Sequence, residues 1–77
     1  MTNSPINIFK KNLKFYRTQK GLTQEKLSEI SGISSDYISE MERGKKTPSF
    51  KRLILLANAL DIEIYKLFLD NGRKKFL

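Results

Sequence analysis

Apolar residues recur along most of this chain at helical spacing, with polar residues between them. Ile6, Phe9, Leu13 and Tyr16 fall at i, i+3, i+7 and i+10, which predicts an inward-facing stripe on a helix from about residue 5 to 19. The same kind of pattern predicts four further helices, at about residues 23–31, 34–43, 50–60 and 63–69. No stretch alternates between apolar and polar residues as a strand requires. The pattern therefore predicts an all-α fold of five helices.

The later helices supply the rest of the predicted core. The second and third helices carry apolar residues at helical spacing: Leu27, Ile30, Ile38 and Met41. The fourth and fifth helices add a second set of inward positions: Phe50, Leu53, Leu56, Ala57, Leu60, Ile64, Leu67 and Phe68. Apolar residues left outside these faces cluster near the end of the chain and suggest an interface: Ile54, Leu55, Tyr65 and Leu69.

The segment that joins the second and third helices carries strong local signals. Leu22 precedes a possible N-cap at Thr23, and Leu27 follows at the spacing of a hydrophobic staple. The same arrangement repeats at residues 33–38. Gly32, between the two, can take the left-handed conformation that ends a helix and redirects the chain. Two short helices joined by such a turn form a helix-turn-helix, whose second helix can enter the major groove of DNA.

The charge pattern favours this interpretation over an ordinary helical hairpin. A hairpin explains the caps and the glycine, but not polar residues that start the third helix beside a loop with Lys45 and Lys46. The net charge of +7 favours a polyanionic partner. An acidic membrane surface would attract the same charge, but it requires a basic helix with a broad apolar face. The stripe of the first helix is better explained as core. We therefore expect double-stranded DNA as the partner and no membrane.

The length and composition of the chain limit which kinds of site and which classes of protein are possible. The chain has 77 residues, enough for one domain with a modest core, so a partner subunit is a reasonable expectation. It contains no cysteine and no histidine, which excludes a disulfide scaffold and removes the commonest general base and metal ligand. No apolar run approaches the ~20 residues of a membrane span, and the start lacks a signal pattern. These features predict a cytoplasmic protein without catalytic residues, metal site or cofactor.

Three segments, LTQEKLSEISGIS, DYISEMERGKKTPS and LANAL, resemble the phage-repressor type of helix-turn-helix domain, the Cro/Xre family, over about residues 6–69. The resemblance implies a compact five-helix domain, placed at residues 1–70, and a short basic tail is expected at residues 71–77. It also implies a homodimer that binds a palindromic operator and regulates transcription. The short form is similar to the controller proteins of restriction–modification systems, and equally to stand-alone phage or plasmid repressors.

The resemblance also assigns roles to individual residues. Gln24 matches a glutamine that contacts the sugar–phosphate backbone while steadying the recognition helix. Arg17 and Glu42 match an ion pair between the first helix and the end of the third, with a phosphate contact by Arg17 as the alternative. The loop GKKTPS matches the one that meets phosphate. The full set expected at the DNA is Thr23, Gln24, Ser34, Ser35, Asp36, Tyr37, Ser39, Arg43, Lys45, Lys46 and Thr47.

Several of these residues have structural explanations of comparable weight. Ser35 can hydrogen-bond to several bases, yet the chemistry of a helix start explains it nearly as well. Asp36 can accept from the amino group of cytosine, but an acidic side chain in the first turn also suits the helix dipole, and we favour capping of the helix slightly over cytosine readout. Tyr37 is equally suited to packing beneath the helix and to touching a thymine methyl or a phosphate. Lys45 and Lys46 suit phosphate, although a solvated basic loop has the same composition.

The leading functional prediction is a dimeric, sequence-specific transcriptional regulator, with dimer contacts at Leu55, Tyr65 and Leu69. Contact with RNA polymerase would use Glu25 and Glu29, although helix-end electrostatics and solvation explain these two better. The alternative is an antitoxin-like module that uses the same fold to hold a protein partner. An enzyme is poorly supported. The sequence leaves open the operator, the regulated genes, and whether control is positive or negative.

Overall fold

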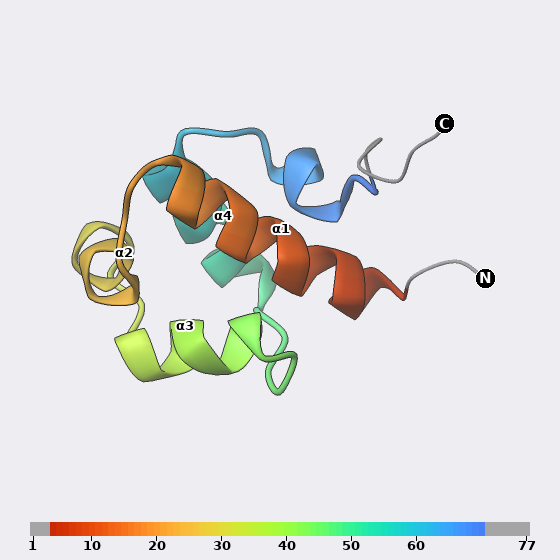
Figure 1. The fold of residues 1–77 in the computed structure, drawn as a ribbon, viewed down its shortest axis with the longest axis horizontal. Helices are drawn as coiled ribbons and strands as arrows, with labels where there is room; N and C mark the ends of the chain where they lie inside the picture. Colours follow the sequence, from red (N-terminus) through yellow and green to blue (C-terminus); the bar gives the residue numbers. More distant parts are fainter. Residues whose placement is uncertain (1–3, 71–77) are drawn as a thin grey trace.

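The computed structural model describes residues 4–70, so the tail predicted at residues 71–77 lies outside the described residues. Within residues 4–70 the chain forms helices and no strand, as Figure 1 shows. The elements, in chain order, are α1 (Pro5–Gln19), α2 (Gln24–Ser31), α3 (Ser35–Glu42), α4 (Phe50–Leu60) and η1 (Ile64–Phe68). The all-α class is thereby confirmed.

The prediction of a fifth α-helix at residues 63–69 is wrong, because this segment is the short 3₁₀-helix η1. It begins after Glu63 without a side-chain cap, and it is only five residues long. A segment of that length completes little more than one α-turn, so α-helix nucleation is unfavourable and the tighter 3₁₀ form is common. The described residues therefore contain four α-helices and one 3₁₀ turn.

Each α-helix begins at a hydroxyl that accepts a hydrogen bond from a backbone N–H three residues later. These bonds measure 3.0–3.3 Å. Each one satisfies a backbone N–H of the first turn that has no partner within the helix. The capping residues are Ser4, Thr23, Ser34 and Ser49. The predicted helix starts are correct to within about one residue because capping chemistry is local.

The core is a cluster of fully or nearly fully buried apolar side chains contributed by every helix. Its members are Phe9, Leu13, Leu27, Ile33, Ile38, Met41, Leu56, Ala57, Leu60 and Leu67. Leu53, Ile6 and Tyr16 pack against this cluster while partly exposed. The predicted stripe of α1 is therefore confirmed.

The prediction of core positions is wrong for three residues that are exposed, Ile30, Phe50 and Phe68, and Ile64 is half-buried but is not among the side chains that pack against the cluster. Ile30 is 52% exposed and Phe50 is 70% exposed. The buried positions of α2 are Leu27 and Ser31, so the contact stripe leaves Ile30 to one side. Phe50 is the first residue of α4, and helical side chains lean toward the N-terminus, which carries its ring past the core. Phe68 is 41% exposed, although its ring stacks on Phe9 with centroids 5.6 Å apart.

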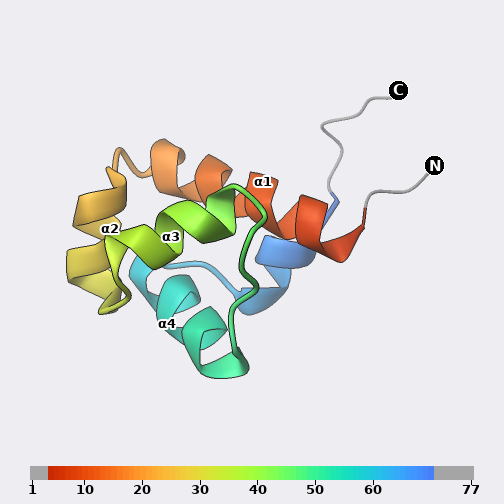
Figure 2. The same cartoon turned by 90° about the horizontal axis from the view of Figure 1, so that it is seen from below.

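The packing leaves one helix at an edge of the molecule. α1 contacts α3 and η1, and α2 contacts α3 and α4. In Figure 1, α3 lies along the lower edge with no other element beneath it. Figure 2, seen from below, places α3 across the front between α1 and α4. One long side of α3 is therefore held by the core and the other is uncovered.

None of the helices in residues 4–70 has the length and apolar character needed to cross a bilayer. The same part of the chain contains no group of three acidic side chains placed to hold a metal ion.

Candidate nucleic-acid interface

The turn between α2 and α3 redirects the chain at Gly32. This residue has φ +80° and ψ +7°, the left-handed conformation, and its N–H donates to the carbonyl of Ser28 at 2.8 Å. The Ser31 hydroxyl then accepts from the N–H of Ile33 at 3.1 Å. A side chain at position 32 would be strained because L-residues rarely adopt this φ. The predicted glycine turn of the helix-turn-helix is confirmed.

The two sides of α3 differ sharply in what they contact. Ile38 and Met41 are completely buried and fix the helix to the core. Asp36 is exposed on the other side, and Ser35 and Ser39 are half-buried beside it. Within residues 4–70 these three polar side chains make no hydrogen bond or ion pair. Their donors and acceptors are therefore available to a ligand that lies along α3.

Thr23 and Ser34, two of the predicted DNA contacts, are the N-caps of α2 and α3. The hydroxyls of Thr23 and Ser34 accept from the backbone N–H groups of Lys26 at 3.0 Å and Tyr37 at 3.1 Å. The side-chain cap of α3 is thus Ser34, not Asp36. A capping hydroxyl still has its own proton to donate, so the O–H of each residue can donate a hydrogen bond to a phosphate oxygen.

Tyr37 connects α3 to the following loop and to α4. Its hydroxyl donates to the carbonyl of Thr47 at 3.1 Å, and its ring lies beneath the guanidinium of Arg52 at 4.3 Å. The ammonium of Lys46 is 5.9 Å from the same ring. The ring is half-buried and packs against the core. The packing role of Tyr37 is therefore present in the structure, and a contact with DNA stays a prediction.

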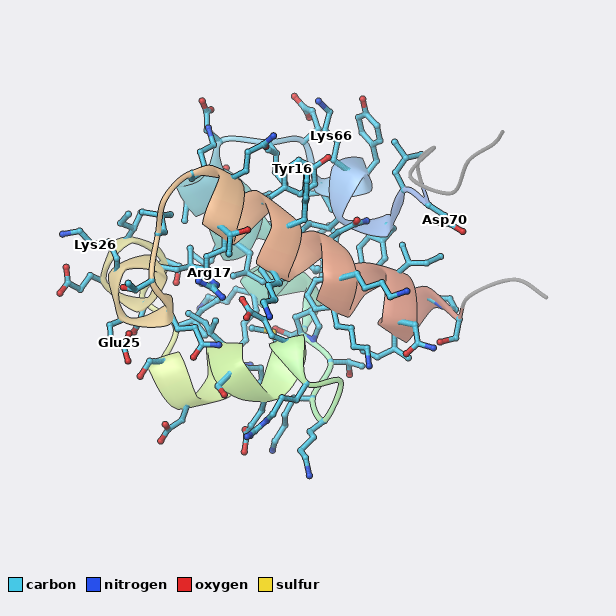
Figure 3. All side chains as sticks on the ribbon, viewed as in Figure 1. Tyr16, Arg17, Glu25, Lys26, Lys66 and Asp70 are labelled. Carbon is cyan, nitrogen blue, oxygen red and sulfur yellow. The ribbon has the colours of Figure 1, made fainter. Side chains whose placement is uncertain are left out.

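Arg17 of α1 lies between α1 and α3 (Figure 3) and forms a largely buried ion pair with Glu42 at the end of α3. Arg17 donates from Nε to Glu42 Oε2 at 2.6 Å and from Nη2 to Oε1 at 3.0 Å. Its Nη1 also donates to the carbonyl of Leu22 at 2.7 Å. The hydrogen bonds to Glu42 raise the pKa of Arg17 above its ordinary value, against the opposing effect of burial. The ion pair expected from the resemblance is present.

Gln24 joins this ion pair, because its amide Nε2 donates to Glu42 Oε1 at 3.1 Å. The first residue of α2 is thereby tied to the last residue of α3. This bond agrees with the expected role of Gln24 in steadying α3, and its contact with the sugar–phosphate backbone stays a prediction. We define Arg17, Gln24 and Glu42 as the buried ionic cluster.

The loop after α3 carries the exposed cations. Arg43 caps the helix, and Lys45, Lys46 and Thr47 are exposed. Gly44 has φ +78°, and its N–H donates to the carbonyl of Met41 at 3.1 Å. The turn presents both lysines to solvent at the end of α3. We define residues 43–47 as the basic loop.

The residues expected at a dimer contact fall into two groups. Tyr65 is 61% exposed and Leu69 is 45% exposed. Leu55, in contrast, is half-buried and packs against the core, so it does not belong with the apolar residues left on the surface. Ile54, the neighbouring residue, is 38% exposed. The exposed members of the expected dimer contact are therefore Ile54, Tyr65 and Leu69, which we define as the exposed apolar set.

Sequence reasoning missed the role of Asn12. This residue is completely buried, and its amide nitrogen lies 3.0–3.2 Å from the backbone carbonyl oxygens of Lys66, Leu67 and Leu69. The amide fastens η1 to the middle of α1. One signal was available in the sequence, since Asn12 lies three residues after Phe9 on the predicted inward stripe, where a polar residue requires an internal partner.

Comparison with known proteins agrees with this geometry. Residues 13–67 match the model of the helix-turn-helix family. The control protein C.SmaI of Serratia marcescens is 39% identical over 67 residues, which cover 87% of this chain and 80% of the relative. The HTH-type transcriptional regulator y4dJ of Sinorhizobium fredii, itself uncharacterised, is 41% identical over 60 residues, or 78% of each chain.

A solved structure shows the same fold. The crystal structure of the restriction–modification controller protein C.AhdI from Aeromonas hydrophila superposes with a TM-score of 0.79 at 41% identity. The match covers 82% of this chain and 96% of that one. The described turn, caps and packing of α2 and α3 are those of a helix-turn-helix, and the chain belongs to the helix-turn-helix family of the Cro/Xre type.

Proposed function

We propose that this protein is a sequence-specific transcriptional regulator that acts in the cytoplasm as a homodimer and inserts α3 into the major groove of a palindromic operator. The observation that carries the proposal is the uncovered side of α3, where Ser35, Asp36 and Ser39 have no partner within residues 4–70. The basic loop lies directly after this helix. Polar side chains with free donors and acceptors beside a cluster of cations suit base edges flanked by phosphates.

The proposed contacts divide by chemistry. Ser35, Asp36 and Ser39 face the bases and supply the sequence preference, and Tyr37 contributes through the part of its ring that remains exposed. The basic loop grips the phosphate backbone and supplies affinity that is independent of sequence. The helix starts at Thr23–Gln24 and at Ser34 add backbone N–H groups suited to phosphate.

Dimerisation is proposed at the exposed apolar set, Ile54, Tyr65 and Leu69. A symmetric contact there would place the two copies of α3 about one DNA turn apart, ~34 Å, which matches two half-sites of a palindrome. The similarity to C.SmaI and C.AhdI supports, as a narrower proposal, a controller of a restriction–modification system. A methyltransferase gene and an endonuclease gene beside this gene would support that role.

Repression and activation place different requirements on the surface of the bound dimer. Repression requires only that the bound dimer covers a promoter. Activation requires a surface for RNA polymerase, and the acidic residues of α2 are already explained by helix-end electrostatics and solvation. Glu29 pairs with Lys26 at 3.3 Å, and Glu25 lies in the first turn of α2, where a carboxylate already interacts favourably with the helix dipole. Repression by occlusion is therefore the form of control that we propose.

Selection of binding sites from a random duplex library at near-physiological salt tests the proposal. We expect an enriched palindrome with half-sites about one helical turn apart. A Tyr65→Lys variant should be monomeric by sedimentation and should lose cooperative binding to the full palindrome. Lys51→Gln, an exposed change elsewhere on the surface, is the matched control.

Binding with a steep salt dependence but no enriched sequence would contradict the proposal, because the protein would then recognise phosphate alone. The antitoxin-like alternative would become the better hypothesis in that case. A Tyr65→Lys variant that remains dimeric would move the interface to another face and leave the DNA-binding proposal intact.

A further inference from the structure

Lys10 of α1 reaches across to the basic loop. A Cβ atom placed on Gly44 would lie 3.2 Å from Cδ of Lys10, 3.9 Å from Cε and 3.5 Å from the ammonium nitrogen Nζ. The lysine stem therefore rests on the backbone of Gly44, and its charged end lies beside the start of the loop. Although the two residues are far apart in sequence, the packing of α1 on α3 brings them together.

The approach depends on the glycine. Gly44 has φ +78°, a conformation that L side chains rarely adopt, and the missing Cβ leaves room for the methylene groups of Lys10. Lys10 is half-buried by this packing, whereas Lys45 and Lys46 are exposed. An ammonium group commonly stays hydrated while its stem packs on a surface, so the stem contact orients the charge without neutralising it.

No described group neutralises the charge of Lys10. The ion pairs within residues 4–70 are Arg17–Glu42 and Lys26–Glu29, and no carboxylate oxygen in this range lies within 4.0 Å of Lys10 Nζ. The loop beside it adds the like charges of Arg43, Lys45 and Lys46. Gathering cations without a counterion is unfavourable unless an anion is bound there.

We infer that Lys10 binds a DNA phosphate together with the basic loop, so that the phosphate-binding surface extends from α3 onto α1. This inference rests on the proposed DNA-binding function and adds a residue that is remote from the helix-turn-helix in sequence. The phosphate is one that flanks the groove entered by α3, next to the one held by Lys45 and Lys46. The contact contributes affinity and no base preference.

The test is the salt dependence of binding to the selected operator, measured by fluorescence anisotropy between low and near-physiological salt. Lys10→Gln should lower the slope of log K against log salt by about 0.9 for each protomer, hence by about 1.8 for a dimer. Lys10→Arg should keep the wild-type slope because it keeps the charge. Lys66→Gln is the matched control, since Figure 3 places Lys66 on the opposite side of α1 from α3.

The outcomes separate this inference from the proposed function. A reduced slope for Lys10→Gln, with equal fold-losses on operator and scrambled DNA and a normal Lys66→Gln slope, would support it. An unchanged slope for Lys10→Gln, while Lys45→Gln lowers it, would overturn the inference and leave the function standing. Wild-type protein that shows no operator preference would instead refute the proposed function. Thermal midpoints within a degree or two of wild type verify that each variant is folded.

Discussion

The polar residues on the two sides of α3 differ in whether the fold supplies them with partners. On the inner side, Glu42 accepts from Arg17 and from Gln24, and both carboxylate oxygens are occupied. On the outer side, Asp36 and Ser39 make no side-chain bond within residues 4–70. Polar residues that the fold has already satisfied are structural, and those left unsatisfied beside a cationic loop are the candidates for binding. Substitutions on the two sides should therefore separate stability from recognition.

The largest effect is expected from Glu42→Ala, which removes the acceptor shared by the buried ionic cluster. The Arg17 side chain is 10% exposed and that of Glu42 is 5% exposed, so the arginine would be left as a buried, unpaired cation. We expect a loss of about 3–5 kcal/mol in the free energy of unfolding, measured by urea titration. For a small domain this is a large part of the total stability.

Glu29→Ala is the control for that change because it breaks an ion pair whose side chains are 59% and 71% exposed. Exposed pairs contribute little, so the free energy of unfolding should change by about 0.5 kcal/mol or less. Similar losses for Glu42→Ala and Glu29→Ala would contradict the structural role assigned to the inner side of α3.

A smaller loss of stability is expected from Asn12→Ala, which removes the donor to three backbone carbonyls of the η1 region. Buried carbonyls that lose their donor should cost about 2 kcal/mol. Hydrogen exchange should also become faster at the amides of η1 before it changes in α2 and α3. Asn58→Ala, the same substitution at an exposed position of α4, should leave both measurements unchanged. Uniform acceleration across all helices would show that Asn12 serves the whole core and not η1 alone.

How far the sequence predicts this molecule depends on whether an interaction is local. The starts of α2 and α3 were predictable because Thr23 and Ser34 bond to backbone groups three residues away. The amide of Asn12 bonds to carbonyls 54 to 57 residues later, and no local pattern encodes such a contact. Phe50 has the spacing of a core residue, but helical spacing alone does not show that Phe50 is the first residue of α4, where its side chain points past the core.

In the candidate site, too, local features were predictable from the sequence and long-range contacts were not. The residue types of the outer face of α3 and of the basic loop were predicted, whereas their partners were not. The bond from Tyr37 to Thr47 and the approach of Lys10 to Gly44 depend on how α3, the loop and α1 meet in space. The left-handed conformation of Gly32 was predictable because the turn is short. Tertiary packing therefore decides which polar residues remain free to bind.

Tyr37→Phe tests a residue that lies between the two sides of α3. The change removes the hydroxyl that donates to Thr47 and leaves the ring beneath Arg52. We expect a loss of about 1 kcal/mol in the free energy of unfolding and faster motion of the basic loop in NMR relaxation. Tyr16→Phe is the control, because the Tyr16 hydroxyl makes no hydrogen bond within residues 4–70. Unchanged loop dynamics in Tyr37→Phe would mean that the loop is positioned by its backbone bonds alone.

The smallest effect on stability, and the clearest one on recognition, is expected from Asp36→Ala. Asp36 is exposed in the first turn of α3, where removing a carboxylate costs at most about 0.3–1 kcal/mol of helix-dipole interaction. If the carboxylate accepts from a cytosine amino group, repeated site selection should show a weaker preference for cytosine at one position of each half-site. The free energy of discrimination against other bases at that position should fall by about 1–3 kcal/mol. Asp36→Asn should shift that preference toward adenine, because an amide pairs with the adenine edge. An unchanged preference together with a lower thermal midpoint would leave Asp36 with its dipole role alone, and base reading would then rest on Ser35 and Ser39.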